Sequence, residues 1–247
     1  MMRRKIRMNK KKLKEQKQQL HRELDWEHPL SPEEKFYLLG PGRLPKELLR
    51  AFRVFLESAR GFIKFRRITN CITIFGSARF NENHKYYKLA RRMGQLLAEN
   101  NFSVMTGGGP GIMEAANRGA KDKGGRTIGC NIKIRHEQYP NAYLDKWITF
   151  NYFFVRKVML TKHSRGFIVM PGGFGTLDEL FEMATLIQTE KIENFPVVLM
   201  GIDYWQPLLD FLQNTLAKEG TIDQDDVVKI KLTDSPEEAI NFIRDYQ

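Results

Sequence analysis

The chain has 247 residues, 42% of them hydrophobic, which is enough for a complete core and excludes disorder throughout. Its formal net charge of +11 is unevenly spread, because residues 1–17 hold nine Lys/Arg and one acid. The remaining residues include 31 Lys/Arg and 28 Asp/Glu, a net charge of +3, so the globular part is nearly balanced. The basic arm predicts a solvated tail, and a contact with nucleic acid or an acidic partner is the alternative interpretation.

Residue types typical of secreted, membrane or metal-binding proteins are sparse. Cys71 and Cys130 are the only cysteines, and both lie in apolar runs, which favours reduced, buried thiols. The five histidines are scattered without the spacing of metal ligands, so we expect no metal and no cofactor. No apolar run reaches the roughly 18 residues of a membrane span, and residues 1–30 lack the apolar core of a signal peptide. We therefore expect a cytoplasmic protein without membrane contact.

Three segments follow one another along the chain. Residues 1–30 are expected to form a basic arm, 31–70 a helical extension packed on the core, and 71–247 the main domain. Within the extension, 45–65 has the spacing of an amphipathic helix. Its apolar positions are Leu48, Leu49, Phe52, Phe55, Leu56 and Ile63. We expect this face to pack on the core or on a second subunit.

From residue 71 onward, short β-branched runs alternate with longer amphipathic runs. This alternation predicts an α/β fold with a Rossmann-like, doubly wound parallel sheet of six or seven strands and helices on both faces. The expected strands are 71–75, 103–106, 127–132, 147–150, 166–170, 196–200 and, from a weaker pattern, 227–232. The expected helices are 84–100, 111–123, 153–162, 177–188, 205–218 and 236–246. In such a sheet, ligands bind outside the carboxyl ends of the strands.

Glycine-rich turns follow three of the predicted strands. Their sequences are Gly76-Ser77-Ala78-Arg79, Gly107-Gly108-Gly109-Pro110-Gly111 and Pro171-Gly172-Gly173-Phe174-Gly175-Thr176. Glycine lets the backbone approach a ligand closely, and a helix that follows such a turn points its first N–H groups and its positive dipole end at the ligand. Three such turns at one sheet edge indicate a nucleotide-sized ligand. Neither the G-x-G-x-x-G dinucleotide fingerprint nor a P-loop occurs, which counts against NAD chemistry and NTP hydrolysis.

Charged residues flank the third turn on both sides. Asp178 and Glu179 fall in the first turn of the following helix, where carboxylates often serve only as partners of the helix dipole. Arg156 and Lys157 lie on an otherwise apolar helix just before the strand that leads into the turn. One interpretation of these two cations is a solvated edge with packed aliphatic stems. The other is a cleft in which an arginine binds phosphate or orients a carboxylate and alters its pKa.

The spacing from Arg156-Lys157 to residues 171–179 resembles the paired signature of the LONELY GUY family. Gly76-Ser77 and the 107–111 turn followed by Ile112-Met113-Glu114 match the family's order, so the resemblance covers about residues 71–213. Members are cytokinin riboside 5'-monophosphate phosphoribohydrolases, often labelled lysine decarboxylases. The resemblance implies a Rossmann-like nucleotide-binding catalytic domain and a homodimer or larger homo-oligomer. It also implies hydrolysis of the N-glycosidic bond of a nucleoside 5'-monophosphate to free base and ribose 5-phosphate.

The resemblance assigns roles to single residues. Arg156 and Glu179 resemble the family's catalytic pair, whereas Asp178 keeps the role of a helix-start partner. The residues implied to contact substrate are Lys157, Gly172, Gly173, Phe174, Gly175, Thr176, Thr185, Gly76, Ser77, Gly108, Gly109 and Glu137. Phe174 replaces a frequent Tyr of the family pattern, and residues before 71 resemble longer bacterial members.

We expect the 5'-phosphate at residues 172–176 and Glu179 facing the anomeric carbon, where a carboxylate stabilises oxocarbenium-like charge or orients water. Three rival functions stay open. A molybdenum-cofactor carrier-like protein of the same fold would bind a nucleotide without chemistry. A pyridoxal-phosphate decarboxylase would need a Schiff-base lysine, for which the sequence offers no recognisable context. A nucleic-acid binder would work through the basic arm. Our expected partner is a nucleoside 5'-monophosphate and neither nucleic acid nor membrane.

Overall fold

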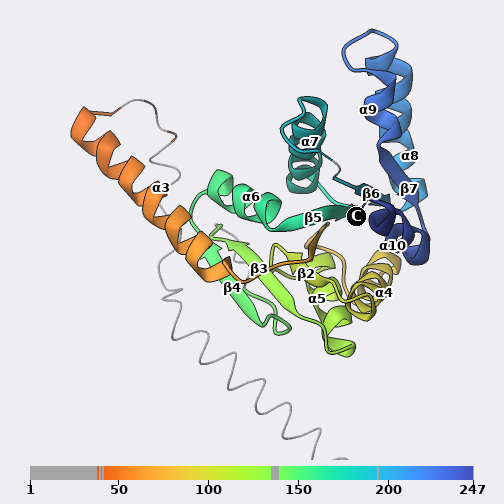
Figure 1. The fold of residues 1–247 in the computed structure, drawn as a ribbon, viewed down its shortest axis with the longest axis horizontal. Coiled ribbons are helices and arrows are strands. Elements are labelled where there is room, and N and C mark those ends of the chain that lie inside the picture. Colours follow the sequence, from red (N-terminus) through yellow and green to blue (C-terminus); the bar gives the residue numbers. More distant parts are fainter. Residues whose placement is uncertain (1–37, 39, 41, 135–138, 194, 247) are drawn as a thin grey trace, which may run out of the picture.

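The computed structural model describes residues 38–246 except 39, 41, 135–138 and 194 (Figure 1). The basic arm expected at 1–30 and the predicted contact residue Glu137 lie outside these described residues. Seven strands form one parallel sheet in the order β4-β3-β2-β1-β5-β6-β7. Their bounds are β1 Cys71–Phe75, β2 Ser103–Thr106, β3 Thr127–Ile132, β4 Lys146–Phe150, β5 Ser164–Val169, β6 Val197–Met200 and β7 Ile230–Thr233. The predicted α/β fold with a parallel sheet is confirmed.

Helices cover both faces of the sheet, and each face has its own apolar core. The first core joins the sheet to α4 Lys85–Glu99, α5 Ile112–Asp122 and α10 Pro236–Asp245. The second joins it to α6 Phe153–Lys162, α7 Phe174–Gln188, α8 Ile202–Phe211, the π-helix η1 Leu212–Ala217 and α9 Gln224–Val228. Because apolar layers lie on both sides, the central strand β1 is buried along its whole length, as is usual in parallel sheets.

The strand order places a topological switch point between β1 and β5. From β1 the chain moves outward through β2 and β3 to β4, and it then returns to β5 on the other side of β1. Thr73 to Phe75 of β1 pair with Phe167 to Val169 of β5, so both strands end at the same level. The loops that follow these two strands therefore lie side by side, where ligands of open α/β sheets bind.

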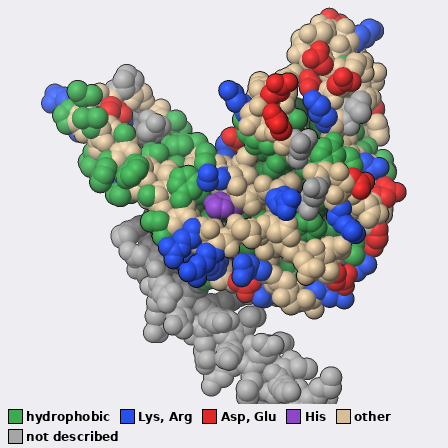
Figure 2. Space-filling model, viewed as in Figure 1, with side chains coloured by type: hydrophobic (Ala, Val, Ile, Leu, Met, Phe, Trp, Pro, Cys, Tyr) green, Lys and Arg blue, Asp and Glu red, His purple; other side chains and the backbone are tan. Residues whose placement is uncertain are grey.

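The helix expected at 45–65 is present as α3 Leu44–Phe65, but only its carboxyl-terminal half packs on the core. Figure 1 shows α3 extending away from the sheet, and Figure 2 shows hydrophobic side chains gathered along it. All six apolar positions of the expected core face, Leu48, Leu49, Phe52, Phe55, Leu56 and Ile63, are at least half exposed. Of the two expected partners of this face, the core of the same chain is therefore wrong: the amino-terminal half of α3 lies away from the sheet, and in the other half Glu57, Gly61 and Phe65 are the buried residues. Packing of the face on a second subunit stays a prediction.

The buried end of α3 is joined to the beginning of α6. The carboxylate of Glu57 accepts hydrogen bonds from the backbone N–H of Asn151 (2.8 Å) and Tyr152 (3.1 Å) and from the Asn151 side chain (2.7 Å). One turn later, Gly61 lies so close to Met159 of α6 that an added Cβ would be 2.8 Å from its sulfur. Glu57 thus caps α6 from another helix, where a carboxylate satisfies N–H groups that have no partner within the helix.

Two expected elements near the carboxyl end differ from the structure. The range 227–232 was predicted as one strand, but its first residues end helix α9 and only Ile230–Thr233 forms β7. A capping box between Asp223 and Asp226 begins α9, and this polar signal outweighs the β-branched residues that follow. The helix expected at 205–218 begins earlier, at Ile202, and continues as the π-helix η1. Both cysteines are free and buried, as predicted.

Candidate active site

The three glycine-rich turns meet at the switch point and are joined by backbone hydrogen bonds. The N–H of Ser77 donates to the carbonyl of Pro171 (3.0 Å), and the N–H of Ile112 donates to the carbonyl of Ser77 (3.0 Å). A cavity of about 580 Å³ opens beside them. Its size falls in the range of small-ligand sites, so the predicted convergence on one crevice is what the structure has.

The third turn forms the floor of the cavity at the start of α7. Gly172, Gly173, Phe174, Gly175 and Thr176 all line the cavity. Gly172 is required here because an added Cβ would collide with the Thr176 side chain and lie 3.0 Å from the N–H nitrogen of Ser77. The first turn of a 15-residue helix therefore faces the cavity with its positive dipole end, which favours an anion.

A buried ion pair forms one wall of the cavity. Arg156 Nη1 on α6 donates to Glu179 Oε1 on α7 over 2.9 Å, and Arg156 Nε donates to the carbonyl of Cys130 at 2.8 Å. Both side chains are about 90% buried, so the pair is largely removed from water. Gly107 leaves room for the guanidinium, since an added Cβ would be 2.6 Å from Arg156 Nη2. The solvated-edge interpretation therefore does not hold for Arg156.

Burial controls the ionisation of Glu179. It raises the pKa of this carboxyl from an ordinary 4.5 to about 7, and the charge and hydrogen bond of Arg156 oppose the rise. Both the acid and the carboxylate are consequently populated near neutral pH. We call residues 172–176, at the start of α7, the anion cradle. A carboxyl group with such a raised pKa, lining the same cavity as this cradle, is suited to acid–base catalysis or to stabilising a developing positive charge.

A match to a family model covers much of the chain. A family model described as "Possible lysine decarboxylase" fits residues 113–243, more than half of the chain. The chain belongs to this family, the LONELY GUY family. It is 32% identical over 162 residues to a cytokinin riboside 5'-monophosphate phosphoribohydrolase of Arabidopsis thaliana, which covers 64% of this chain and 73% of the relative.

The chain is also similar to a longer bacterial protein and to a protein of known structure. The chain is 30% identical over 163 residues to the pyrimidine/purine nucleotide 5'-monophosphate nucleosidase of Escherichia coli, matching 60% of this chain and 36% of that longer protein. A solved molybdenum cofactor binding protein from the phototrophic bacterium Rippkaea orientalis is also similar. It is 26% identical with a TM-score of 0.53, covering 72% of this chain and 96% of that one.

Nine of the residues that the LONELY GUY resemblance singled out line the cavity. They are Arg156, Glu179, Gly76, Ser77 and the five residues 172–176. Phe174 is 93% exposed at the rim, where an aromatic ring can meet a ligand or another molecule. Lys157 is outside the cavity and forms ion pairs with Asp178 (3.2 Å) and Glu182 (3.3 Å). Asp178 thus has its partner on α6, and its expected place in the first turn of the helix is wrong, because α7 begins at Phe174 rather than at Leu177 and has no acidic residue in its first turn.

Gly108 and Gly109 do not line the cavity but shape the turn behind it. The N–H of Gly108 is already used within the turn, because it donates to Thr106 Oγ1 over 2.9 Å. The carbonyls of both glycines accept from Asn141, through its backbone N–H (2.8 Å) and its side-chain amide (3.0 Å). Gly108 has φ of +73°, which explains glycine at this position. Their hydrogen bonds hold the turn rather than a substrate.

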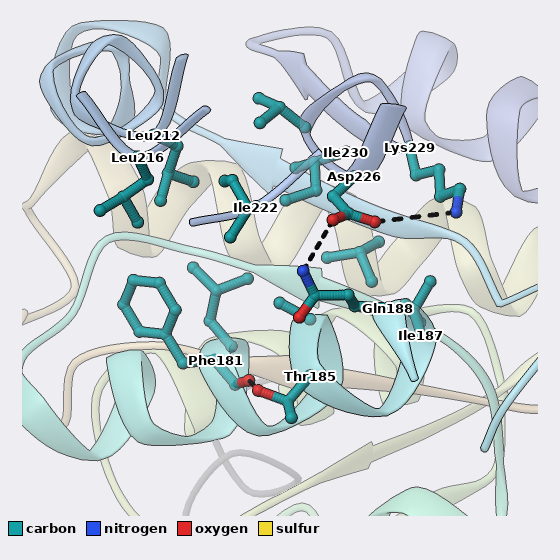
Figure 3. Close-up of a pocket in the computed structure, with 14 residues that line it drawn as sticks. Phe181, Thr185, Ile187, Gln188, Leu212, Leu216, Ile222, Asp226, Lys229 and Ile230 are labelled. Atoms are coloured by element: carbon teal, nitrogen blue, oxygen red, sulfur yellow. Dashed lines mark hydrogen bonds and ion pairs between the residues drawn. The ribbon is translucent and has the colours of Figure 1, made fainter. Parts of the chain in front are cut away.

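Thr185 lies on a different side of α7, in a second pocket between α7, η1, α9 and β7 (Figure 3). Its hydroxyl donates to the carbonyl of Phe181 in the same helix over 2.8 Å. The pocket has a volume of about 120 Å³ and is mostly apolar, with an amide–carboxylate hydrogen bond between Gln188 and Asp226 at its edge. Within this chain, Thr185 therefore does not meet Glu179 at the first cavity.

The apolar walls of the cavity escaped the sequence reasoning. They are contributed by Phe75, Met113, Ile132, Ile134 and Phe153, from four different parts of the chain. Tyr204 on α8 was also missed, although its hydroxyl donates to the carbonyl of Gly172 over 2.7 Å. Only the tertiary fold brings these side chains to the turns; Met113 lies in the motif quoted above but was not assigned to the site.

The described residues contain neither a metal-binding cluster nor a membrane-spanning helix. No group of three or more His, Cys, Asp or Glu in this part of the chain is arranged to hold a metal ion. Within the same residues, no helix combines the length and apolar character that crossing a bilayer requires.

Proposed function

We propose that the chain is a nucleoside 5'-monophosphate phosphoribohydrolase, which releases the free base and ribose 5-phosphate. The observation that carries the proposal is the buried Arg156–Glu179 pair, 2.9 Å apart, beside a glycine cradle at a helix start. The names of the relatives in Arabidopsis thaliana and Escherichia coli support the same reaction class. No lysine is among the described residues that line the cavity, so lysine decarboxylation through a Schiff base has no support there.

The proposed mechanism begins with the phosphate at residues 172–176. Binding this non-reacting group fixes the ribose and places its anomeric carbon near Glu179. As the bond from the anomeric carbon to the base nitrogen breaks, the Glu179 carboxylate stabilises positive charge on the sugar or orients the attacking water. Water adds its oxygen to the anomeric carbon and loses a proton to the Glu179 carboxylate or to solvent, and a proton from the same source neutralises the leaving base nitrogen.

Arg156 has a positioning and electrostatic role in this proposal. Its guanidinium is held at the carbonyl of Cys130 and at Glu179, so it fixes the carboxylate against the cavity wall. It also opposes the rise of the pKa of Glu179 and keeps part of the carboxyl ionised near neutral pH. The apolar walls exclude water from the base and favour a flat heterocycle.

Release of free base from AMP by the purified full chain tests the proposal. We expect adenine and ribose 5-phosphate in equal amounts, and loss of this release in Glu179→Gln with AMP binding retained. Asp178→Asn is the matched control, because it removes the neighbouring carboxylate, which is exposed and pairs with Lys157. Near-normal turnover in Glu179→Gln would overturn the assignment. A panel of AMP, GMP, CMP and a cytokinin riboside monophosphate identifies the base.

A binding protein without chemistry is the second candidate, favoured by the similarity to the molybdenum cofactor binding protein of Rippkaea orientalis. The same assay separates the two, since a carrier binds a nucleotide-like ligand and releases no base. An ionisable glutamate buried beside the anion cradle favours the hydrolase, because binding alone gains nothing from a carboxylate near a phosphate.

We further propose that the protein is a cytoplasmic homodimer or larger homo-oligomer with an amino-terminal extension over residues 31–70. The exposed apolar side chains of α3, from Leu48 to Ile63, support the proposal because water disfavours such a surface. Light scattering after gel filtration of the full chain gives the mass, and a monomer at micromolar concentration would contradict it. Leu49→Glu is expected to lower the mass without altering the helix content.

A further inference from the structure

Among the described residues that line the cavity, Arg79 is the charged one that the proposed mechanism does not use. It belongs to the first glycine turn and lines the cavity together with Arg156. Arg156 is engaged by Glu179 and by the carbonyl of Cys130. Arg79 is exposed and forms no ion pair with any carboxylate in the part of the chain that the structure describes. Its guanidinium is therefore available to a ligand in the cavity.

The backbone fixes Arg79 beside the anion cradle. Its N–H donates to Ser77 Oγ over 3.1 Å, and the N–H of Ser77 donates in turn to the carbonyl of Pro171 (3.0 Å). Gly172 follows Pro171 directly and packs against Ser77. The first and third turns thus form one connected unit, and Arg79 lines the same cavity as residues 172–176.

Charge balance shows what Arg79 can contribute. A phosphate monoester carries about −1.5 to −2 charges at neutral pH, whereas a helix start supplies only about +0.5. The Arg156–Glu179 pair adds little net charge when Glu179 is ionised, and Lys157 is held by Asp178 and Glu182 outside the cavity. Among the described residues that line the cavity, Arg79 is the cation left to balance the anion.

We propose that Arg79 binds the 5'-phosphate and makes the site select nucleoside monophosphates over nucleosides. The inference rests on the proposed phosphoribohydrolase function and names the residue that sets its substrate class. A guanidinium donates two parallel hydrogen bonds to phosphate oxygens, which a nucleoside with a bare 5'-hydroxyl cannot accept. Arg79 is thus a specificity-determining residue, and the chemistry at the anomeric carbon does not depend on it directly.

Kinetics with AMP and adenosine test the proposal in Arg79→Ala, in Arg79→Lys and in a matched control, Arg126→Ala. Arg126 is exposed and lies outside the cavity, so its loss removes the same charge elsewhere. In Arg79→Ala, we expect kcat/KM for AMP to fall about 10- to 100-fold while the value for adenosine stays the same. Arg79→Lys retains the positive charge but not the two parallel donors of the guanidinium. Its kcat/KM for AMP is expected to lie between the values of the wild type and of Arg79→Ala.

The ratio of kcat/KM for AMP to that for adenosine decides the outcome. A ratio in Arg79→Ala equal to that in Arg126→Ala would overturn the role of Arg79. If the wild type releases no base from AMP, the hydrolase proposal itself fails. The affinity for ribose 5-phosphate, measured by calorimetry, then still tests the role of Arg79. An affinity that is about 10- to 100-fold weaker in Arg79→Ala, but not in Arg126→Ala, supports the proposal. Equal affinity in the two alanine variants, or no binding by the wild type, overturns it.

Discussion

Replacing Glu179 with Gln is expected to stabilise the fold above neutral pH while removing most of the activity. Burial raises the pKa of Glu179 from an ordinary 4.5 to about 7, against the opposing charge of Arg156. The folded chain therefore keeps a proton on Glu179 over a pH range in which the unfolded chain has released it. Because the folded state binds more protons, the free energy of unfolding falls as pH rises from about 4.5 to about 7, and the loss is complete above this range.

The size of this loss follows from the two pKa values. One pKa unit corresponds to about 1.4 kcal/mol, so the ionisation of buried Glu179 costs about 3 kcal/mol of stability. Gln has nearly the size of the protonated acid and carries no charge, so the variant lacks this pH dependence. We expect Glu179→Gln to be about 3 kcal/mol more stable than the wild type near pH 8 and about equally stable near pH 4.

Urea unfolding followed by circular dichroism at several pH values measures the difference. Asp178→Asn is the control, because Asp178 is exposed and its removal leaves Glu179 in place. Base release from AMP, measured on the same samples, should fall by about 10²- to 10⁴-fold in Glu179→Gln. A variant less stable than the wild type near pH 8, or a stability difference that stays constant with pH, would refute the reasoning.

The remaining predictions concern other residues around the site. In Arg156→Ala, nothing opposes the effect of burial on the pKa of Glu179, so the pH at which kcat/KM for AMP rises should move above about 7. An unchanged pH profile would show that Arg156 does not control the ionisation of Glu179. Gly172→Ala places a Cβ against the Thr176 side chain and should weaken AMP binding about tenfold or more by calorimetry, with an unchanged dichroism spectrum. Glu57→Ala removes three hydrogen bonds at the start of α6 and should lower the free energy of unfolding by about 2–4 kcal/mol; an unchanged Tm would contradict this.

The sheet could be predicted from the sequence because each central strand carries its own signal. The buried runs at 71–75, 103–106 and 127–132 are strands with those same bounds, since β-branched and apolar residues are bounded by turn residues on both sides. The end of the chain was harder, because α9 and β7 are short and adjoin one another. The path of α3 away from the sheet could not be predicted, since periodicity tells which residues share a face and not what covers that face.

In the candidate site, too, some features could be predicted from the sequence and others could not. The glycine turns could be predicted because they follow directly from strand ends, whereas the Arg156–Glu179 pair was implied by the family resemblance, since local sequence does not show that side chains 23 residues apart meet. Thr185 lies outside the first cavity for a geometric reason: it is six residues beyond Glu179, and at about 100° per residue it points to another side of α7. Tyr204 contacts Gly172 across 32 residues of sequence, a distance at which only the tertiary fold carries information.

The hydrogen bonds of Glu57 connect the amino-terminal segment to the helix that carries Arg156 of the candidate site. The residues matched by the family model begin at 113, yet the helix that presents Arg156 is capped by a carboxylate from a helix far upstream of that boundary. The smallest fragment expected to work therefore starts before Glu57, and a shortened protein that begins at β1 would lose rigidity at Arg156 first. Although most of α3 extends away from the sheet, its carboxyl-terminal half therefore stabilises the helix that positions Arg156 at the candidate site.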